Sequence, residues 1–79
     1  MKTKPLFVRA EWDDEADVCV ATSDDVPGLA TEEITLEALV KKLKVMIPEL
    51  LIANHATFEE EIPFEIITRR FEVAQRPHP

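Results

Sequence analysis

The chain is poor in cysteine, glycine and long apolar runs. It has one cysteine, Cys19, and one glycine, Gly28, among its 79 residues. A lone cysteine cannot form a disulfide within the chain, which fits the reducing cytoplasm. No apolar run approaches the ~20 residues that span a bilayer, and no paired Cys or His spacing suits zinc. We therefore expect a cytoplasmic protein with no membrane contact, no metal and no other cofactor.

Positive charge is also scarce. The chain has 16 acidic and 9 basic residues, for a net charge of −7. Nucleic-acid binding depends on lysine and arginine displacing counterions from the phosphates, so we expect no direct contact with nucleic acid. A small basic protein is a better electrostatic partner. Solubility alone also accounts for such a charge, and both interpretations stay open.

The overall composition is that of a small globular domain. Hydrophobic residues make up 46% of the chain and charged residues 32%, a balance typical of folded chains. We predict one domain over residues 1–79, ordered over 5–74, with a frayed tail at 75–79. Because so small a core leaves little stability in reserve, we expect self-association, most simply as a homodimer.

Alternating apolar residues predict strands at 6–12, 18–22, 29–33 and 64–73. The first two form a hairpin around a polar turn. One face of the first strand carries the apolar row Leu6, Val8, Ala10 and Trp12. We expect Val18 and Val20 to share that face, with Cys19 and Ala21 opposite. The last strand has apolar residues on both faces, so both should be partly covered.

A helix is predicted from residue 36 onward. Its apolar stripe recurs at three- and four-residue steps, as an amphipathic helix requires: Leu36, Leu39, Val40, Leu43, Ile47, Leu50 and Leu51. Thr35 is the expected N-cap. Pro48 should bend the helix without dividing it, because the stripe keeps its phase beyond the proline. Asn54 is the expected left-handed residue at the C-terminal end.

The order β-β-β-α-β predicts an α+β fold, a small, mostly antiparallel sheet with one long, Pro-bent helix on one face. The opposite face stays open unless another subunit covers it, which suggests a dimer interface. The candidate interface residues are Phe7, Arg9, Cys19, Ile67 and Phe71. Trp12 has two interpretations, a core residue at the hairpin end or an exposed interface anchor.

The single glycine belongs to a Pro27-Gly28 pair ahead of the helix. Proline presets the first corner of a type II turn, and glycine accepts the positive φ of the second. We therefore predict a structural turn that joins the sheet to its helix, and not a binding site.

The string Asp25-Val26-Pro27-Gly28-Leu29-Ala30-Thr31, followed by Thr35-Leu36-Glu37 at the helix start, resembles the HicB-like antitoxin domains of bacteria. Within them, Pro-Glu-Leu-Leu at 48–51 is more typical of a group of short stand-alone proteins of unknown function. The resemblance covers residues 7–54 and implies a truncated ribonuclease-H-like fold. It also implies dimers and a non-catalytic domain that neutralises a small basic, messenger-RNA-cleaving toxin. Family antitoxins usually add a C-terminal DNA-binding segment; this chain ends after its last strand, so direct DNA binding is not expected.

Catalysis is not expected, although the fold resemblance suggests one alternative. Ribonuclease-H-like nucleases clamp a phosphodiester with two metal ions held by carboxylates. The candidate ligands here gather at hairpin ends and turns, where aspartate is common for turn geometry alone: Glu11, Asp13, Asp14, Asp17, Asp24 and Asp25. Cys19, in a strand, suits a small core residue better than a nucleophile paired with His55 or His78. The acidic run 59–61 is either a solvated loop or a surface for a basic partner.

Overall fold

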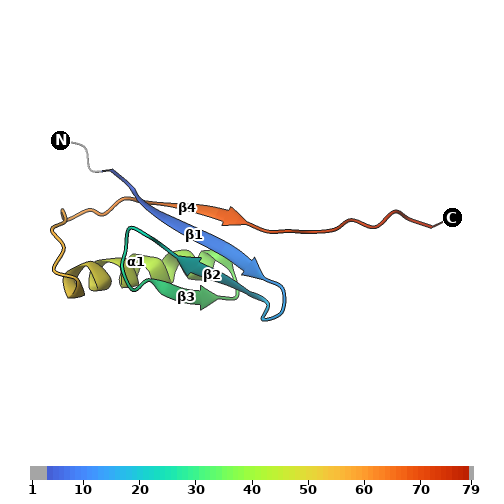
Figure 1. Cartoon of the computed structure of the whole chain (residues 1–79), viewed down its shortest axis with the longest axis horizontal. Coiled ribbons are helices and arrows are strands. Elements are labelled where there is room, and N and C mark those ends of the chain that lie inside the picture. The colour runs from blue at the N-terminus through green and yellow to red at the C-terminus, as the bar shows by residue number, and fades with distance from the viewer. Residues whose placement is uncertain (1–3, 79) are drawn as a thin grey trace.

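The computed structural model describes residues 4–78 and shows a four-stranded sheet with one helix against one face (Figure 1). The elements follow in the order β1 (Leu6–Asp13), β2 (Val18–Thr22), β3 (Ala30–Glu33), α1 (Leu36–Ala53) and β4 (Phe64–Arg69). The predicted α+β class and β-β-β-α-β order are confirmed.

The sheet is mixed. Its strand order is β3-β2-β1-β4, so β1 and β2 lie inside while β3 and β4 form the two edges. The pairings β1–β2 and β2–β3 are antiparallel, whereas β4 runs parallel to β1, with Leu6 opposite Phe64. A parallel strand needs a long return connection. Here α1 and the loop after it bring the chain back to the end of the sheet where β1 begins (Figure 1).

The register of the first hairpin corrects one prediction. Asp13 pairs with Val18 and Trp12 with Cys19, so each even-numbered residue of β1 faces an odd-numbered residue of β2. Directly opposite residues point to the same face of a sheet. The face that carries Leu6 is therefore shared by Cys19 and Ala21, and not by Val18 and Val20 as predicted.

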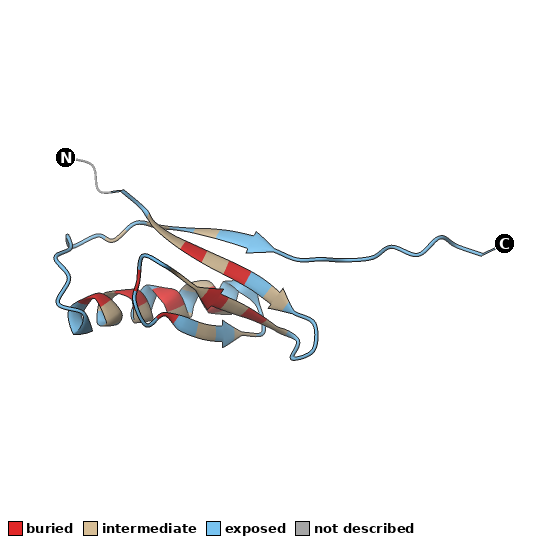
Figure 2. Cartoon of the chain, viewed as in Figure 1, coloured by how far each residue is buried: buried red, intermediate tan, exposed pale blue. Residues whose placement is uncertain are grey.

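The core lies between that face and α1, where the buried residues gather (Figure 2). The sheet contributes Val8, Ala10, Cys19 and Ala21, the loop before β3 contributes Val26 and Leu29, and α1 contributes Leu39, Leu43, Ile47 and Leu51. Each large aliphatic side chain adds about 1.5–3 kcal/mol by leaving water. The predicted stripe is confirmed over its middle, but Leu36 stays 39% exposed, so the buried part begins at Leu39.

The end of α1 differs from the prediction by one residue. The helix continues through Pro48 as one element, as expected. Asn54 has a φ of −89°, and His55 instead adopts the left-handed conformation with φ +57°. The N–H of His55 donates to the Ile52 carbonyl at 3.0 Å, and that of Ala56 to the Leu51 carbonyl at 3.0 Å. This pair of bonds is the Schellman arrangement, in which the left-handed residue follows the cap.

Strand β4 is shorter than the predicted segment 64–73. Arg69 pairs with Glu11 near the end of β1, and past that point little of β1 is left to bond. Residues 70–78 continue in extended form and are all exposed (Figures 1 and 2). Pro79, the last residue of the predicted frayed tail, lies outside the described residues. Within residues 4–78, no helix combines the length and apolar character needed to cross a bilayer.

Candidate functional site

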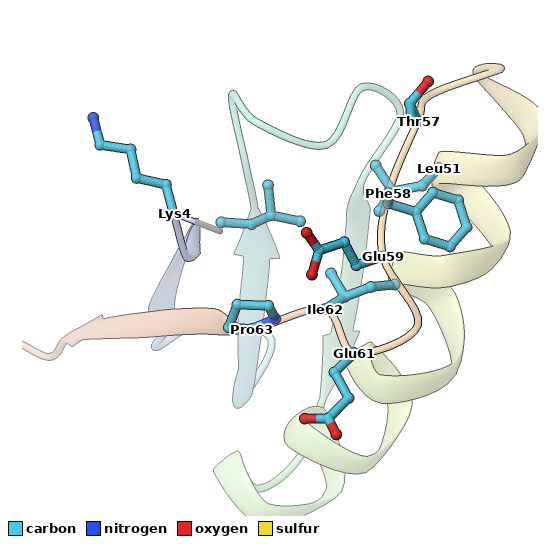
Figure 3. A pocket seen from close by; sticks show the side chains of 9 residues that line it. Lys4, Leu51, Thr57, Phe58, Glu59, Glu61, Ile62 and Pro63 are labelled. Atoms are coloured by element: carbon cyan, nitrogen blue, oxygen red, sulfur yellow. The ribbon is translucent and has the colours of Figure 1, made fainter. Parts of the chain in front are cut away.

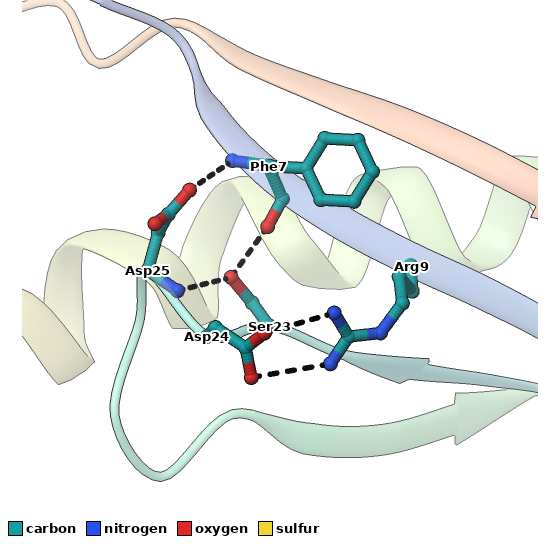
Figure 4. A network of polar contacts seen from close by, with 5 residues as sticks. All are labelled: Phe7, Arg9, Ser23, Asp24 and Asp25. Carbon is teal, nitrogen blue, oxygen red and sulfur yellow. Dashed lines mark hydrogen bonds and ion pairs between the residues drawn. The ribbon is translucent and has the colours of Figure 1, made fainter.

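The loop that follows β2 is fastened to the start of β1 by a polar network (Figure 4). The Phe7 N–H donates to a carboxylate oxygen of Asp25 at 2.8 Å, and the Ser23 hydroxyl donates to the Phe7 carbonyl at 2.5 Å. The Asp25 N–H donates in turn to the Ser23 hydroxyl at 3.0 Å. Two backbone groups of β1 thereby gain partners beyond the end of β2. The network makes Asp25 a structural residue.

Asp24 is held by Arg9 from the open face of the sheet (Figure 4). Two guanidinium nitrogens donate to its two carboxylate oxygens, at 3.0 and 3.3 Å. The hydrogen bond with Arg9 and then its charge lower the pKa of Asp24, and the reciprocal contacts raise the pKa of Arg9. The side chains of Asp24 and Arg9 are 85% and 41% exposed, so water screens the pair.

The Pro27-Gly28 turn has the predicted geometry. Gly28 has a φ of +87°, and the Leu29 N–H donates to the Val26 carbonyl at 3.1 Å. Proline at the second position and a positive-φ glycine at the third match a type II turn. A Cβ added at Gly28 would lie 3.6 Å from Leu50, an ordinary contact. The requirement for glycine is therefore conformational.

Asn54 joins this turn to the end of α1. Its side-chain N–H donates to the Pro27 carbonyl at 2.9 Å, across 27 positions of sequence. Asn54 was expected to be the left-handed residue at the helix end; its side chain instead connects that end to the Pro27-Gly28 turn. The N-cap prediction is confirmed at the other end, where the Ala38 N–H donates to the Thr35 hydroxyl at 3.1 Å.

The candidate metal ligands are spread over separate turns. Asp13 accepts from the N–H groups of Glu15 and Ala16 at 3.0 and 3.2 Å, the bonding that forms an aspartate turn. Asp17 has a φ of +54° in the same turn. Within residues 4–78, no three His, Cys, Asp or Glu side chains gather as a metal site.

Cys19 lies under α1 and not on the open face where it was predicted. It is 7% exposed, and burial raises the pKa of its thiol. A raised pKa keeps the thiol protonated at neutral pH, which is the opposite of what a nucleophile requires. The hairpin register is the reason for the error.

Trp12 is partly buried and packs against the core cluster. Its ring also contacts a cation from the segment that directly follows β4. The guanidinium carbon of Arg70 lies 4.3 Å from the centre of the Trp12 ring, within cation–π distance. The indole therefore packs on the core, as the first interpretation predicts, and also contacts Arg70 of the same chain, whereas an interface at Trp12 stays a prediction.

Three of the remaining interface candidates share one surface. Phe7 and Arg9 both lie on the outer face of β1, two residues apart, and Ile67 lies opposite Arg9 on β4. Ile67 is 49% exposed, and Phe71, beyond the strand, is 77% exposed. Among residues 4–78, no helix or strand therefore covers the sheet's outer face up to its edge at β4 (Figure 1).

Two hollows lie at opposite ends of the sheet. One, of about 460 Å³, is lined by Glu11, Trp12, Asp13, Asp14, Val20 and Thr22 at the hairpin end. The other, of about 320 Å³, lies beside the end of α1 and the start of β4 (Figure 3). It is walled by Leu6, Leu51, Phe58, Ile62 and Pro63, with Lys4, Glu59 and Glu61 around it.

Comparison with known proteins identifies the family. A model described as a domain of unknown function, DUF1902, matches residues 5–76. The chain belongs to the DUF1902 family. No curated protein matches it. A crystal structure of the hypothetical protein TTHA1013 from the extremely thermophilic bacterium Thermus thermophilus is similar, with 49% sequence identity and a TM-score of 0.70. The match covers 92% of this chain and 100% of that one.

Membership of DUF1902 brings no activity with it, so function has to be inferred from the surfaces of this chain. Sequence reasoning missed two residues there, Glu65 and Arg69, which lie on the outer face of β4 on either side of Ile67. The signal was present: opposite charges stand two residues before and two residues after an apolar residue in a predicted strand.

Proposed function

We propose that this DUF1902 chain is a non-catalytic protein-binding domain similar to the toxin-neutralising domain of HicB-like antitoxins. Its partner would be a small basic protein. The observation that carries the proposal is the separation of charge along the chain: residues 1–68 hold fifteen Asp and Glu but only six Lys and Arg. A body this acidic attracts a basic protein and repels nucleic acid.

Few of these carboxylates are neutralised within the chain. Among residues 4–78, ion pairs engage two of them, Asp24 and Glu33. The hairpin turn, residues 13–17, is exposed throughout. Its hollow sets Glu11 and Asp14 beside the apolar surface of Val20. Carboxylates at the rim of an apolar hollow suit a lysine or arginine, whose stem is apolar and whose head is charged.

The test uses the protein encoded by the neighbouring reading frame, where that frame is short and basic. Binding is measured by calorimetry with the wild-type chain and with Glu11→Gln/Asp14→Asn, which alters two side chains that form no bond described above. We expect the variant to bind about tenfold more weakly, because two exposed ion pairs contribute up to about 1 kcal/mol each.

The matched control is Glu49→Lys, which changes the net charge by the same two units at an exposed position of α1. It should bind within about twofold of the wild type, since exposed charges beyond a Debye length are largely screened. Equal losses in both variants would leave only non-specific attraction. No binding of the basic protein, together with RNA cleavage that depends on Mg²⁺ or Mn²⁺, would replace the proposal by the nuclease alternative.

A further inference from the structure

The outer edge of β4 has no partner among the described residues of this chain. β4 ends the strand order and pairs with β1 alone. It is six residues long, and Ile67 near its centre is 49% exposed. Unpaired edges of this kind are templates for a further strand, and soluble proteins normally protect them.

The chain beyond β4 continues in the same direction and is coloured as exposed (Figure 2). In residues 70–78, here called the arm, Phe71 is 77% and Val73 66% exposed. The arm contributes to a radius of gyration of 15.7 Å, against about 12 Å for a compact chain of this length. An isolated copy therefore leaves both the edge and the arm uncovered.

The charges along this edge repeat when the strand is reversed. Glu65, Ile67 and Arg69 share the outer face at two-residue spacing. A second β4 running antiparallel therefore meets the first with opposite charges at both ends and isoleucine in the middle. Opposite charges on directly opposed residues stabilise a strand pair, and like charges destabilise it.

We propose that β4 pairs antiparallel with β4 of a second copy, about a twofold axis through facing Ile67 residues. A twofold axis perpendicular to the sheet requires one residue to face its own copy. Centring on Ile67 sets Glu65 opposite Arg69 twice. Centring on Glu65 or Arg69 sets like charges opposite each other. Centring on Ile66 or Thr68 no longer places Glu65 opposite Arg69. The two sheets then join into one of eight strands.

The same register carries the arm along the other copy's acidic loop. Counting from the axis, Phe71 of one copy lies opposite Pro63 of the other, and Val73 opposite Glu61. Residues 69–79 hold three arginines and one glutamate, whereas 59–61 are all glutamate. A basic arm thus meets an acidic loop, as electrostatic complementarity requires.

This interface goes beyond the proposed function and uses different residues from the hairpin hollow. A monomeric chain could still bind a basic protein there, and a dimer could form without any basic partner. The two proposals therefore fail separately.

Charge reversal tests the register. Glu65→Arg sets two arginines opposite each other in both cross-strand pairs, and Arg69→Glu sets two glutamates opposite each other. Sedimentation at low salt should show a wild-type dimer, with the dimer dissociation constant of each single variant raised at least tenfold. An equimolar mixture of the two variants should form a heterodimer. In that heterodimer, each of the two cross-strand pairs joins an arginine of the Glu65→Arg chain to a glutamate of the Arg69→Glu chain.

The heterodimer pairs two β4 strands of opposite charge. The first variant carries arginine at both outer positions of the strand, and the second carries glutamate at both, so every cross-strand pair of the heterodimer is attractive. The double variant exchanges the two charges and should dimerise as the wild type does. A gain on mixing shows that these charges meet across the interface, whereas the weakening in each single variant and the cross-linking at residue 67 test the register itself.

A monomeric wild type at high concentration would overturn the proposal. So would single variants that dimerise like the wild type, or a mixture that fails to associate. Circular dichroism of each variant checks that the chain is folded, since a loss by misfolding would not be reversed by mixing.

Cross-linking tests the axis independently. In a Cys19→Ala background, Ile67→Cys should form a disulfide-linked dimer under mild oxidation. Facing residues of antiparallel strands have Cα atoms about 4.5–5.5 Å apart, within the range a disulfide spans. The matched control Thr68→Cys faces Ile66 of the other copy, so its thiols lie on the far face and apart. Equal cross-linking of the two variants would overturn the register.

Discussion

The two edges of the sheet are built in opposite ways. β3 is four residues long and carries Glu32 and Glu33. Lys42 of α1 holds it, donating to the Glu32 carbonyl at 3.2 Å and pairing with Glu33 at 3.3 Å. β4 is longer, carries one apolar residue between two charged ones on its outer face, and leads into an arm with exposed Phe71 and Val73. Short length, charge and a covering helix are the means by which proteins close an edge.

The difference indicates that this fold protects one edge and leaves the other available. The closed region consists of α1, β1, β2 and β3 with the loop that carries Val26 and Leu29, and the buried hydrophobic core lies within it. The open region, β4 and the arm, contributes only partly buried side chains such as Phe64 and Ile66. Stability should therefore reside in the first region and association in the second.

The largest difference should appear when an isoleucine is replaced by alanine in each region separately. Ile47→Ala, at 1% exposure in α1, should lower the free energy of unfolding by about 2–5 kcal/mol, since it leaves a cavity. Ile67→Ala, at 49% exposure in β4, should stay within about 0.5 kcal/mol. Both are measured by urea denaturation in the Glu65→Arg background, so that association does not contribute. Similar losses at the two positions would remove the distinction between the regions.

The turn that leads into the closed region gives the next effect. Gly28→Val forces a β-branched residue to φ +87°, at a cost of about 1–3 kcal/mol. Gly28→Asn is the control, because asparagine tolerates positive φ better than other non-glycine residues. Thermal unfolding should show a clear loss for valine and a smaller one for asparagine. Equal melting temperatures for valine and wild type would mean that the turn is not type II in solution.

Much of the closed region could be predicted from the sequence because its signals are local. The stripe of α1, the cap at Thr35 and the Pro27-Gly28 turn each depend on residues within a few positions of one another. The hairpin register does not follow from strand patterns, because it is set by the conformation of the turn. The bonds to Asp13 and the positive φ of Asp17 set the conformation of this turn. In the resulting register, even-numbered residues of β1 face odd-numbered residues of β2, so Cys19 lies in the core.

The open region was harder to predict for a different reason. How far β4 extends depends on where β1, its partner, runs out, and that is a property of the parallel pairing. The sequence pattern alone extended the strand to Val73, beyond its observed end at Arg69.

The polar bonds of Asp25 and Asn54 also join residues far apart in sequence, and no short motif indicates them.

The start of α1, directly after the closed edge, should give a moderate effect. Thr35→Ala removes the hydroxyl that accepts from the Ala38 N–H, a loss of about 1 kcal/mol. For a domain of this size that lowers the melting temperature by about 4–8 °C. Thr35→Ser keeps the hydroxyl and should melt close to the wild type. If serine and alanine are equally destabilising, the methyl group and not the cap is what matters.

The smallest effect should be the pH dependence of the Arg9–Asp24 pair, which spans β1 and the loop after β2. Contact with Arg9 lowers the folded-state pKa of Asp24. Such a group adds stability above its unfolded pKa of about 3.9, and this contribution is lost as pH falls through the lower folded value. Asp24→Asn should therefore be slightly less stable than the wild type at pH 7. The two melting temperatures should converge on acidification, with Asp14→Asn as the unpaired control. A gap between Asp24→Asn and the wild type that does not narrow as the pH falls would assign the loss to geometry and not to charge, since a protonated Asp24 no longer attracts Arg9.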